Sequence, residues 1–299
     1  MRITQKMMTN KVNSSLSKNA EKLMKTQSRI SSGKQFTKAS EDPVGMAKAL
    51  DYRKTLDSVD QYVRNISHAR SGLDTGEATL SDIGDLLIRA KELALSQATG
   101  TASPETRLIA AGEVRQLRDQ LIQLANTKQD DRYMFGGRKT DVPPYDPVSP
   151  ANPFRGDDGD FSVIVGDGVT LNVALSGQQA FGDPADPVSV DPVLVLTDLI
   201  TGLEANDSSA ISGQLDALDQ SLSQIVNERA DVGSRLNRLD ATETHWDAFK
   251  INIEQMLSDT EDVDLIQAIS DLTAQQSAFQ ASLASASKII QPSLLDYLR

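Results

Sequence analysis

The segment DLIQAISDLTAQQSAFQASLASASKII, residues 264–290, decides the fold of this chain. Apolar side chains recur in it at every third or fourth position, which is the pattern of a helix with one packed face. They are Leu265, Ile269, Leu272, Phe279, Leu283, Ala286 and Ile290. Gln276 is the one polar residue in this row. A heptad pattern of this kind predicts a coiled-coil partner for the helix.

The same segment lacks charge over an unusual length. No Lys, Arg, Asp or Glu lies between Asp271 and Lys288. An exposed helix face usually carries such residues, because they add ion pairs and solubility. We therefore interpret this helix as one that other chains cover on several sides. Periodicity alone leaves an alternative open, which is an amphipathic helix packed only on its own domain.

The composition favours long helices over a wide globular core. The 299 residues are 39% hydrophobic but only 4% aromatic, so few rings are available to fill such a core. There is no cysteine, which excludes disulfides and metal–thiolate sites. Residues 1–20 show no continuous apolar run of the signal-peptide kind. No segment approaches the ~18 apolar residues that a membrane-spanning helix needs.

Charge is unevenly distributed along the chain, whose net charge is −12. Residues 1–38 contain nine Lys or Arg and one acid, whereas residues 254–299 contain seven acids and two bases. The net charge argues against general nucleic-acid binding. The opposite charges of the two ends favour their pairing as antiparallel helices, within the limits that solvent and salt set.

Helical patterns account for the first half of the chain. Residues 5–30 are predicted to form a helix that ends at Gly33, and its weaker apolar row consists of Val12, Leu16, Leu23 and Ile30. Asp42-Pro43 has the N-cap and first-turn residues of a second helix. Its apolar row alternates steps of three and four, which predicts left-handed supercoiling. The row is Val59, Tyr62, Ile66, Ala69, Leu73, Gly76, Leu80, Ile83, Leu87, Ala90 and Ala94. Ser103-Pro104 begins a third helix, antiparallel to the second.

The character of the sequence changes after Gly137, where eight of the eleven prolines fall between Pro143 and Pro192. The segments 161–165 and 169–175 are predicted to be strands joined at Asp167-Gly168, a type I′ hairpin signal. A helical row resumes near Asn206 and extends to Leu257. We expect residues 258–262 to link that helix to the last one.

Together these patterns predict a mainly α-helical protein. The expected architecture is a long antiparallel coiled-coil rod with both termini at one end and a small β-rich insert domain. Residues 1–41 and 258–299 would be the terminal helices of an assembly region. Residues 42–137 and 193–257 would form the long helical bundle, and residues 138–192 the insert.

We find no catalytic constellation in the sequence. His68 and His245 lie in long helices and belong to no cluster of ligands or catalytic groups. The acidic segment 157–160 lacks the spacing of a calcium-binding loop. We therefore expect no catalytic, cofactor or metal site, and no enzyme.

Several motifs, in their order and spacing, resemble the flagellin family. Segments 29–33 and 40–44, which contain Ser32, Gly33, Asp42 and Pro43, are similar to its N-terminal signature. Segment 227–239, with Arg229, Asn237, Arg238 and Leu239, resembles its C-terminal core. Asn126, Arg132, Phe135 and Gly136, followed by segment 155–159, are similar to the hook-associated branch of the family.

The resemblance implies a secreted structural protein of the bacterial flagellum, exported by the flagellar type III apparatus and located at the hook–filament junction. The partners it implies are copies in a ring, the other hook-associated junction protein, flagellin and a cytosolic export chaperone. It implies neither nucleic-acid binding nor membrane insertion. Assembly would order the terminal helices. The expected interface residues are Leu16, Leu23, Ile30, Leu265, Ile269, Leu272, Phe279, Leu283 and Ile290.

Two alternatives remain open at this point. One is a flagellin filament subunit, which belongs to the same class of protein. The other is a secreted coiled-coil effector whose basic N-terminal helix binds anionic membranes.

Overall fold

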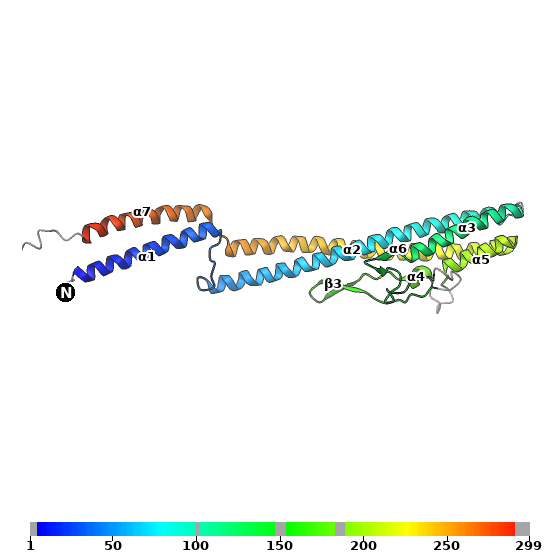
Figure 1. Ribbon diagram of the computed structural model, residues 1–299, viewed down its shortest axis with the longest axis horizontal. Helices are drawn as coiled ribbons and strands as arrows, with labels where there is room; N and C mark the ends of the chain where they lie inside the picture. Colours follow the sequence, from blue (N-terminus) through cyan, green and yellow to red (C-terminus); the bar gives the residue numbers. More distant parts are fainter. Residues whose placement is uncertain (1–4, 100–101, 147–153, 183–188, 291–299) are drawn as a thin grey trace, which may run out of the picture. The chain divides into compact units, whose positions relative to one another are not determined.

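The structure is a computed structural model, and its described residues form two compact units. The described residues are 5–99, 102–146, 154–182 and 189–290. The terminal unit falls within residues 1–58 and 248–299, and the central unit comprises residues 59–247. Two long helices, α2 (Pro43–Gln97) and α6 (Ser208–Glu261), contribute to both units (Figure 1).

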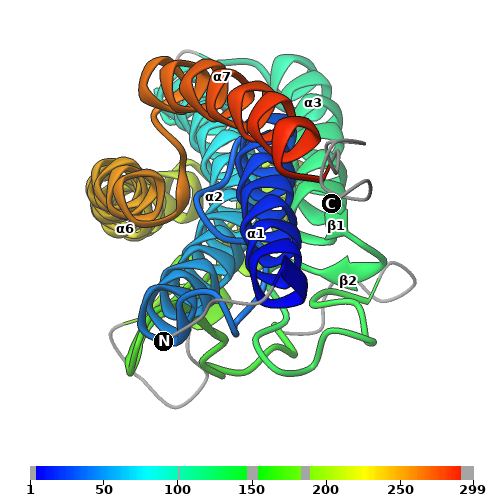
Figure 2. The ribbon, with the colours of Figure 1, turned by 90° about the vertical axis from the view of Figure 1, so that its left-hand side faces the viewer.

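In the terminal unit, α1 (Gln5–Ser32) packs against α7 (Leu265–Ile290). The two helices are antiparallel, because Asn19 Nδ2 donates to Ser282 Oγ at 3.0 Å while Gly33 bonds to Val263. The first turns of α1 and the last turns of α7 therefore lie at the same end of this unit (Figures 1 and 2). This is the pairing that the opposite charges of the two ends predicted.

The ends of the helices follow local capping signals. Gly33, with φ of 69°, stops α1 in the left-handed region that glycine tolerates. Asp42 Oδ1 accepts from the backbone N–H of Val44 and Gly45, at 3.1 and 2.9 Å, and so caps α2. Ser103 caps α3 (Pro104–Ala125) in the same way. These predicted boundaries are confirmed.

One boundary is wrong by four residues. Residues 258–262 were expected to be a linker, but α6 continues through Glu261. The turn to α7 occupies only residues 262–264, and Asp264 Oδ1 accepts from the backbone N–H of Ile266 at 2.9 Å. The Thr260 hydroxyl donates to the Met256 carbonyl at 2.7 Å, so this side chain bonds within the helix.

The central unit is organised around the antiparallel helices α2 and α6. Three ion pairs between them show the antiparallel register, because each joins residues whose numbers sum to nearly the same value: Glu77–Arg229, Arg70–Asp240 and Lys91–Asp219. The predicted apolar rows are confirmed, because they supply the core. Residues fully buried in it include Ile66, Leu80, Ile83, Leu87, Ile211, Leu218, Ile225, Val232 and Leu239.

A helix that the sequence analysis did not assign, α5 (Pro192–Glu204), packs against α3. Asp191 caps it by accepting from the backbone N–H of Val193 at 2.8 Å, and Pro192 is its first residue. Its run of apolar residues is buried on several sides. A helix so buried shows no clean three–four period, which is why the pattern missed it.

The insert, residues 138–192, lies within the central unit and contains one small antiparallel hairpin and α4 (Gly177–Phe181), and a second hairpin precedes it. One hairpin pairs β3 (Ser162–Gly166) with β4 (Val169–Asn172). The prediction of a type I′ turn at Asp167-Gly168 was wrong, because this turn needs a positive φ at both residues and only Gly168 has one. The other hairpin pairs β1 (Lys128–Gln129) with β2 (Arg132–Tyr133).

The positive φ values that a type I′ turn requires occur instead between β1 and β2. Asp130 and Asp131 have φ of 49° and 63°. Aspartate tolerates this region better than most residues, but two in succession are not a standard turn signal. Next to this hairpin, four aromatic side chains form a cluster. It consists of Phe135, Tyr145, Phe154 and Phe181, with ring centroids 5.2–5.7 Å apart.

Candidate assembly interface

The α7 helix presents one face to α1. Buried and half-buried side chains follow one another along it at steps of four and three. They are Ala268, Leu272, Gln275, Phe279, Ser282 and Ala286. Ser282 receives the hydrogen bond from Asn19 of α1, which identifies this face as the one that meets α1. Two predicted interface residues, Leu272 and Phe279, thus lie between the two terminal helices.

A second set of apolar side chains on α7 is exposed. We call it the outward row, and it consists of Leu265, Ile266, Ile269 and Leu283. Their exposed fractions are 50%, 85%, 53% and 46%. Three of them were predicted to be interface residues, whereas Ile266 was not recognised because it falls outside the heptad positions. The side chain of Ile290, another predicted residue, lies outside the described part of the chain.

On α1, the predicted residues Leu16, Leu23 and Ile30 are half-buried. Three methionines of the same helix are exposed: Met7, Met8 and Met24. They lie outside the predicted apolar row of this helix, so the periodicity does not indicate them. An unbranched, polarisable side chain adapts to varied partner surfaces, so exposed methionines suit a helix that packs against another protein.

The two linkers beside the terminal helices pair with each other. The Gln35 N–H donates to the Glu261 carbonyl at 2.6 Å, and the Val263 N–H donates to the Gly33 carbonyl at 2.9 Å. Lys34 and Asp262 form a short antiparallel bridge between these bonds. The connection from α6 to α7 is therefore fixed to the end of α1.

A carboxylate at this junction is almost completely buried. Glu261 is 5% exposed, and Arg53 Nη2 lies 2.5 and 2.6 Å from its two oxygens. Lys34 Nζ lies 2.7 Å from Asp262 and holds the pKa of that carboxyl below its usual range through a hydrogen bond. These charge-assisted hydrogen bonds hold the residues of the junction in one defined arrangement. Its residues are far apart in sequence, so no local signal announced it.

The residues that carry the family resemblance mostly support the architecture. Ser32, Gly33, Asp42 and Pro43 form the ends of α1 and α2. Asn126 follows α3, and its amide exchanges two hydrogen bonds, of 2.9 and 3.0 Å, with the backbone of Tyr145.

The other motif residues divide into two groups. Phe135 and Leu239 are fully buried, Gly136 is buried, and Arg229 pairs with Glu77. A Cβ at Gly136 would lie 2.6 Å from the Lys139 carbonyl oxygen, so the backbone there leaves no space for a larger residue. The exposed group contains Arg132, Asn237 and Arg238.

Two other kinds of site are absent from the described residues. Among their helices, none is both long and apolar enough to cross a membrane. In the same residues, no three His, Cys, Asp or Glu side chains are grouped so that they could hold a metal ion.

Paired terminal helices, long antiparallel helices and a small insert define a helical structural protein of the flagellin type. Residues 3–140 match the family described as the bacterial flagellin N-terminal helical region. Residues 215–298 match the bacterial flagellin C-terminal helical region. The chain belongs to the flagellin family, as its motifs predicted.

Known proteins similar to this chain include flagellar hook-associated protein 3 of Salmonella typhimurium. That protein is 27% identical over 302 residues, which cover 94% of this chain and 95% of the relative. A putative flagellar hook-associated protein from Vibrio parahaemolyticus has a similar structure, with a TM-score of 0.69 at 22% identity, over 74% of this chain and 100% of that one. The flagellar junction protein FlgL from Legionella pneumophila has a TM-score of 0.59 at 16% identity, over 73% and 100%. These structures share the fold.

Proposed function

We propose that this protein is a structural subunit of the bacterial flagellum at the junction between hook and filament. The observation that carries the proposal is its similarity to hook-associated protein 3 along nearly the whole of both chains. The outward row of α7 supports it, because an apolar row left exposed beside a paired helix is typical of a surface that assembles.

In the assembled ring, terminal helices of neighbouring copies pack on the outward row. Burial of this row removes apolar surface from water, which stabilises contact by about 25 cal/mol for each Å². The charge-free stretch between Asp271 and Lys288 lets helices approach without burying unpaired charge. Of the residues predicted from the sequence, the proposal assigns Leu265, Ile269 and Leu283 to the contact between copies, together with Ile266. Leu272 and Phe279 pack against α1 within the single chain.

The other partners follow from the position of such a ring. The second hook-associated protein adjoins it on one side and flagellin on the other. Before export, a cytosolic chaperone covers α7, since an exposed apolar helix would otherwise aggregate. The protein acts outside the cell as a structural component, without enzymatic activity.

The test replaces residues of the outward row by aspartate in a strain that lacks the native gene. Ile269→Asp and Leu283→Asp should abolish filament attachment, so that flagellin is exported but collects in the medium. Each purified variant should melt like the unmodified protein, because both side chains are half exposed in the single chain. Ala241→Asp, an exposed position on α6, is the control and should restore motility.

The outcomes separate this proposal from its rivals. Normal filaments with both variants would contradict the role of the outward row. If deletion of the gene removes the filament protein altogether, this protein is a filament subunit. Strong binding of the whole chain to anionic vesicles would favour the membrane-binding effector.

A further inference from the structure

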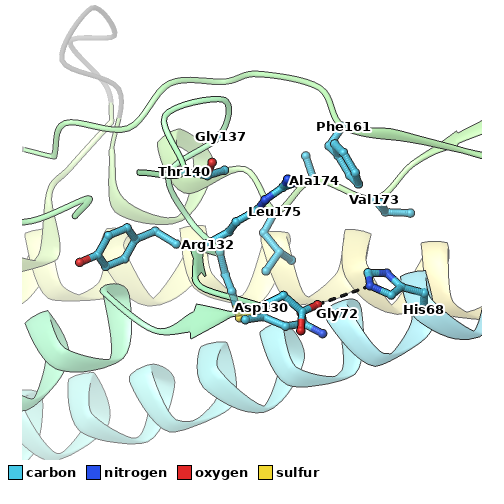
Figure 3. Close-up of a pocket in the computed structure, with 13 residues that line it drawn as sticks. His68, Gly72, Asp130, Arg132, Gly137, Thr140, Phe161, Val173, Ala174 and Leu175 are labelled. Atoms are coloured by element: carbon cyan, nitrogen blue, oxygen red, sulfur yellow. Dashed lines mark ion pairs between the residues drawn. The ribbon is translucent and has the colours of Figure 1, made fainter. Parts of the chain in front are cut away.

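A pocket in the central unit lies far along the sequence from the terminal helices and takes no part in the proposed assembly. It opens between α2, the β1–β2 hairpin and the segments that flank β3 and β4 (Figure 3). Its volume is about 410 Å³. That value falls within the range of about 300–1,000 Å³ that is usual for small-molecule sites in proteins.

One wall of the pocket is apolar. Phe161 is 53% exposed there, although it is a large aromatic side chain, and Leu175 and Val173 continue the wall. Gly72 forms part of the α2 side, and a Cβ at this position would lie 3.1 Å from Gln129 Oε1. The glycine thus keeps space open that any other residue would occupy.

The pocket also contains a cation without a partner. Arg132 lines it, and among the described residues no acceptor or carboxylate pairs with its guanidinium. In Figure 3 the Arg132 side chain extends toward Ala174. The acid in the pocket, Asp130, is directed instead toward His68, with 3.4 Å between Oδ2 and Nε2.

We propose that this pocket binds a small carboxylate with an apolar body, and that Arg132 holds the carboxylate while Phe161 and Leu175 cover the body. A guanidinium presents two parallel N–H groups that match the two oxygens of a carboxylate. The apolar wall beside it favours an aromatic or aliphatic group over a compact inorganic anion. Asp130 adds negative charge to the pocket, so a singly charged ligand fits better than a phosphate.

The test uses the full chain and two probes of nearly equal shape, 4-phenylbutyrate and 4-phenyl-1-butanol. Saturation-transfer NMR detects binding, and titration gives the affinity of each probe. The carboxylate should bind saturably, and the alcohol should bind at least roughly tenfold more weakly because it lacks the charged hydrogen bonds.

Three variants locate the site. Arg132→Gln should weaken binding of the carboxylate roughly tenfold or more and leave binding of the alcohol unchanged. Gly72→Leu should fill the pocket and abolish binding of both probes. Arg64→Gln is the control, because Arg64 is an exposed arginine one helical turn before His68 and does not line the pocket.

Three results would each overturn the proposal. They are equal affinity for the two probes, an Arg132→Gln protein that binds the carboxylate as tightly as the unmodified protein, and the absence of saturable binding. If Gly72→Leu fails to fold, Arg132→Gln still decides the matter, because its side chain is exposed and its removal leaves the core intact.

Discussion

Gly76 on α2 lies against Leu175 of the insert, and its replacement by alanine tests that packing. A Cβ built at Gly76 would lie 2.3 Å from Leu175 Cδ1 and 3.0 Å from Cδ2. Leu175 is buried in the core of the central unit, so it can avoid the methyl group only by moving toward the pocket that it lines. Alanine at this position therefore displaces Leu175 or forces the insert and α2 apart.

Two opposing effects set the magnitude. Replacing glycine by alanine inside a helix stabilises it by about 0.8–1.0 kcal/mol. Overpacking a core typically costs about 1–3 kcal/mol. Gly76→Ala should therefore change the free energy of unfolding by about 0–2 kcal/mol in the destabilising direction.

Two other glycines on long helices provide matched controls. A Cβ at Gly112 would meet nothing within 4 Å, and one at Gly84 would meet only Ile225 Cγ2 at 3.9 Å. Both alanine variants should gain helix stability, by about 0.8–1.0 kcal/mol each. Urea unfolding of the full chain should thus place Gly76→Ala about 1–3 kcal/mol below Gly112→Ala.

A second measurement isolates the contact itself. Leu175→Ala should cost about 2–5 kcal/mol on its own. In the double variant with Gly76→Ala, the new methyl group enters the space that Leu175 vacated, so the two costs should not add. A Gly76→Ala protein as stable as Gly112→Ala, or additive costs in the double variant, would refute this account of the packing.

Two further predictions concern buried polar groups in the central unit. Burial raises the pKa of Glu228 above its ordinary value of about 4.5, so this group favours the folded state at low pH and loses that contribution as pH rises through its folded pKa. Glu228→Gln should therefore gain stability relative to the unmodified protein as pH rises from about 4 to about 8, measured by urea unfolding; a constant difference would contradict this. Tyr145→Phe removes the hydroxyl that donates to Asp191 at 2.8 Å and should cost about 1–3 kcal/mol. Tyr52→Phe on α2 is its control, and equal effects of the two variants in thermal melts would contradict the role of the buried bond.

The sequence by itself determined α1, α2, α3, α6 and α7, and where most of these helices start and stop. Gly33, Asp42-Pro43 and Ser103-Pro104 act on backbone groups within four residues of themselves, so their signals can be read without the fold. The apolar rows of α2 and α6 also predicted their core, because a helix repeats its faces at a fixed period. The order and spacing of several motifs along the chain were sufficient to predict the family.

Only the tertiary structure decided how these elements use their surfaces. It divided the apolar residues of α7 into Leu272 and Phe279, which face α1, and Ile266 and Ile269, which do not. Periodicity marks both sets as apolar, since it contains no information on which neighbour each set meets. The pocket around Arg132 likewise depends on segments about twenty to one hundred residues apart. Such juxtapositions arise from the packing of the whole chain, which local pattern cannot specify.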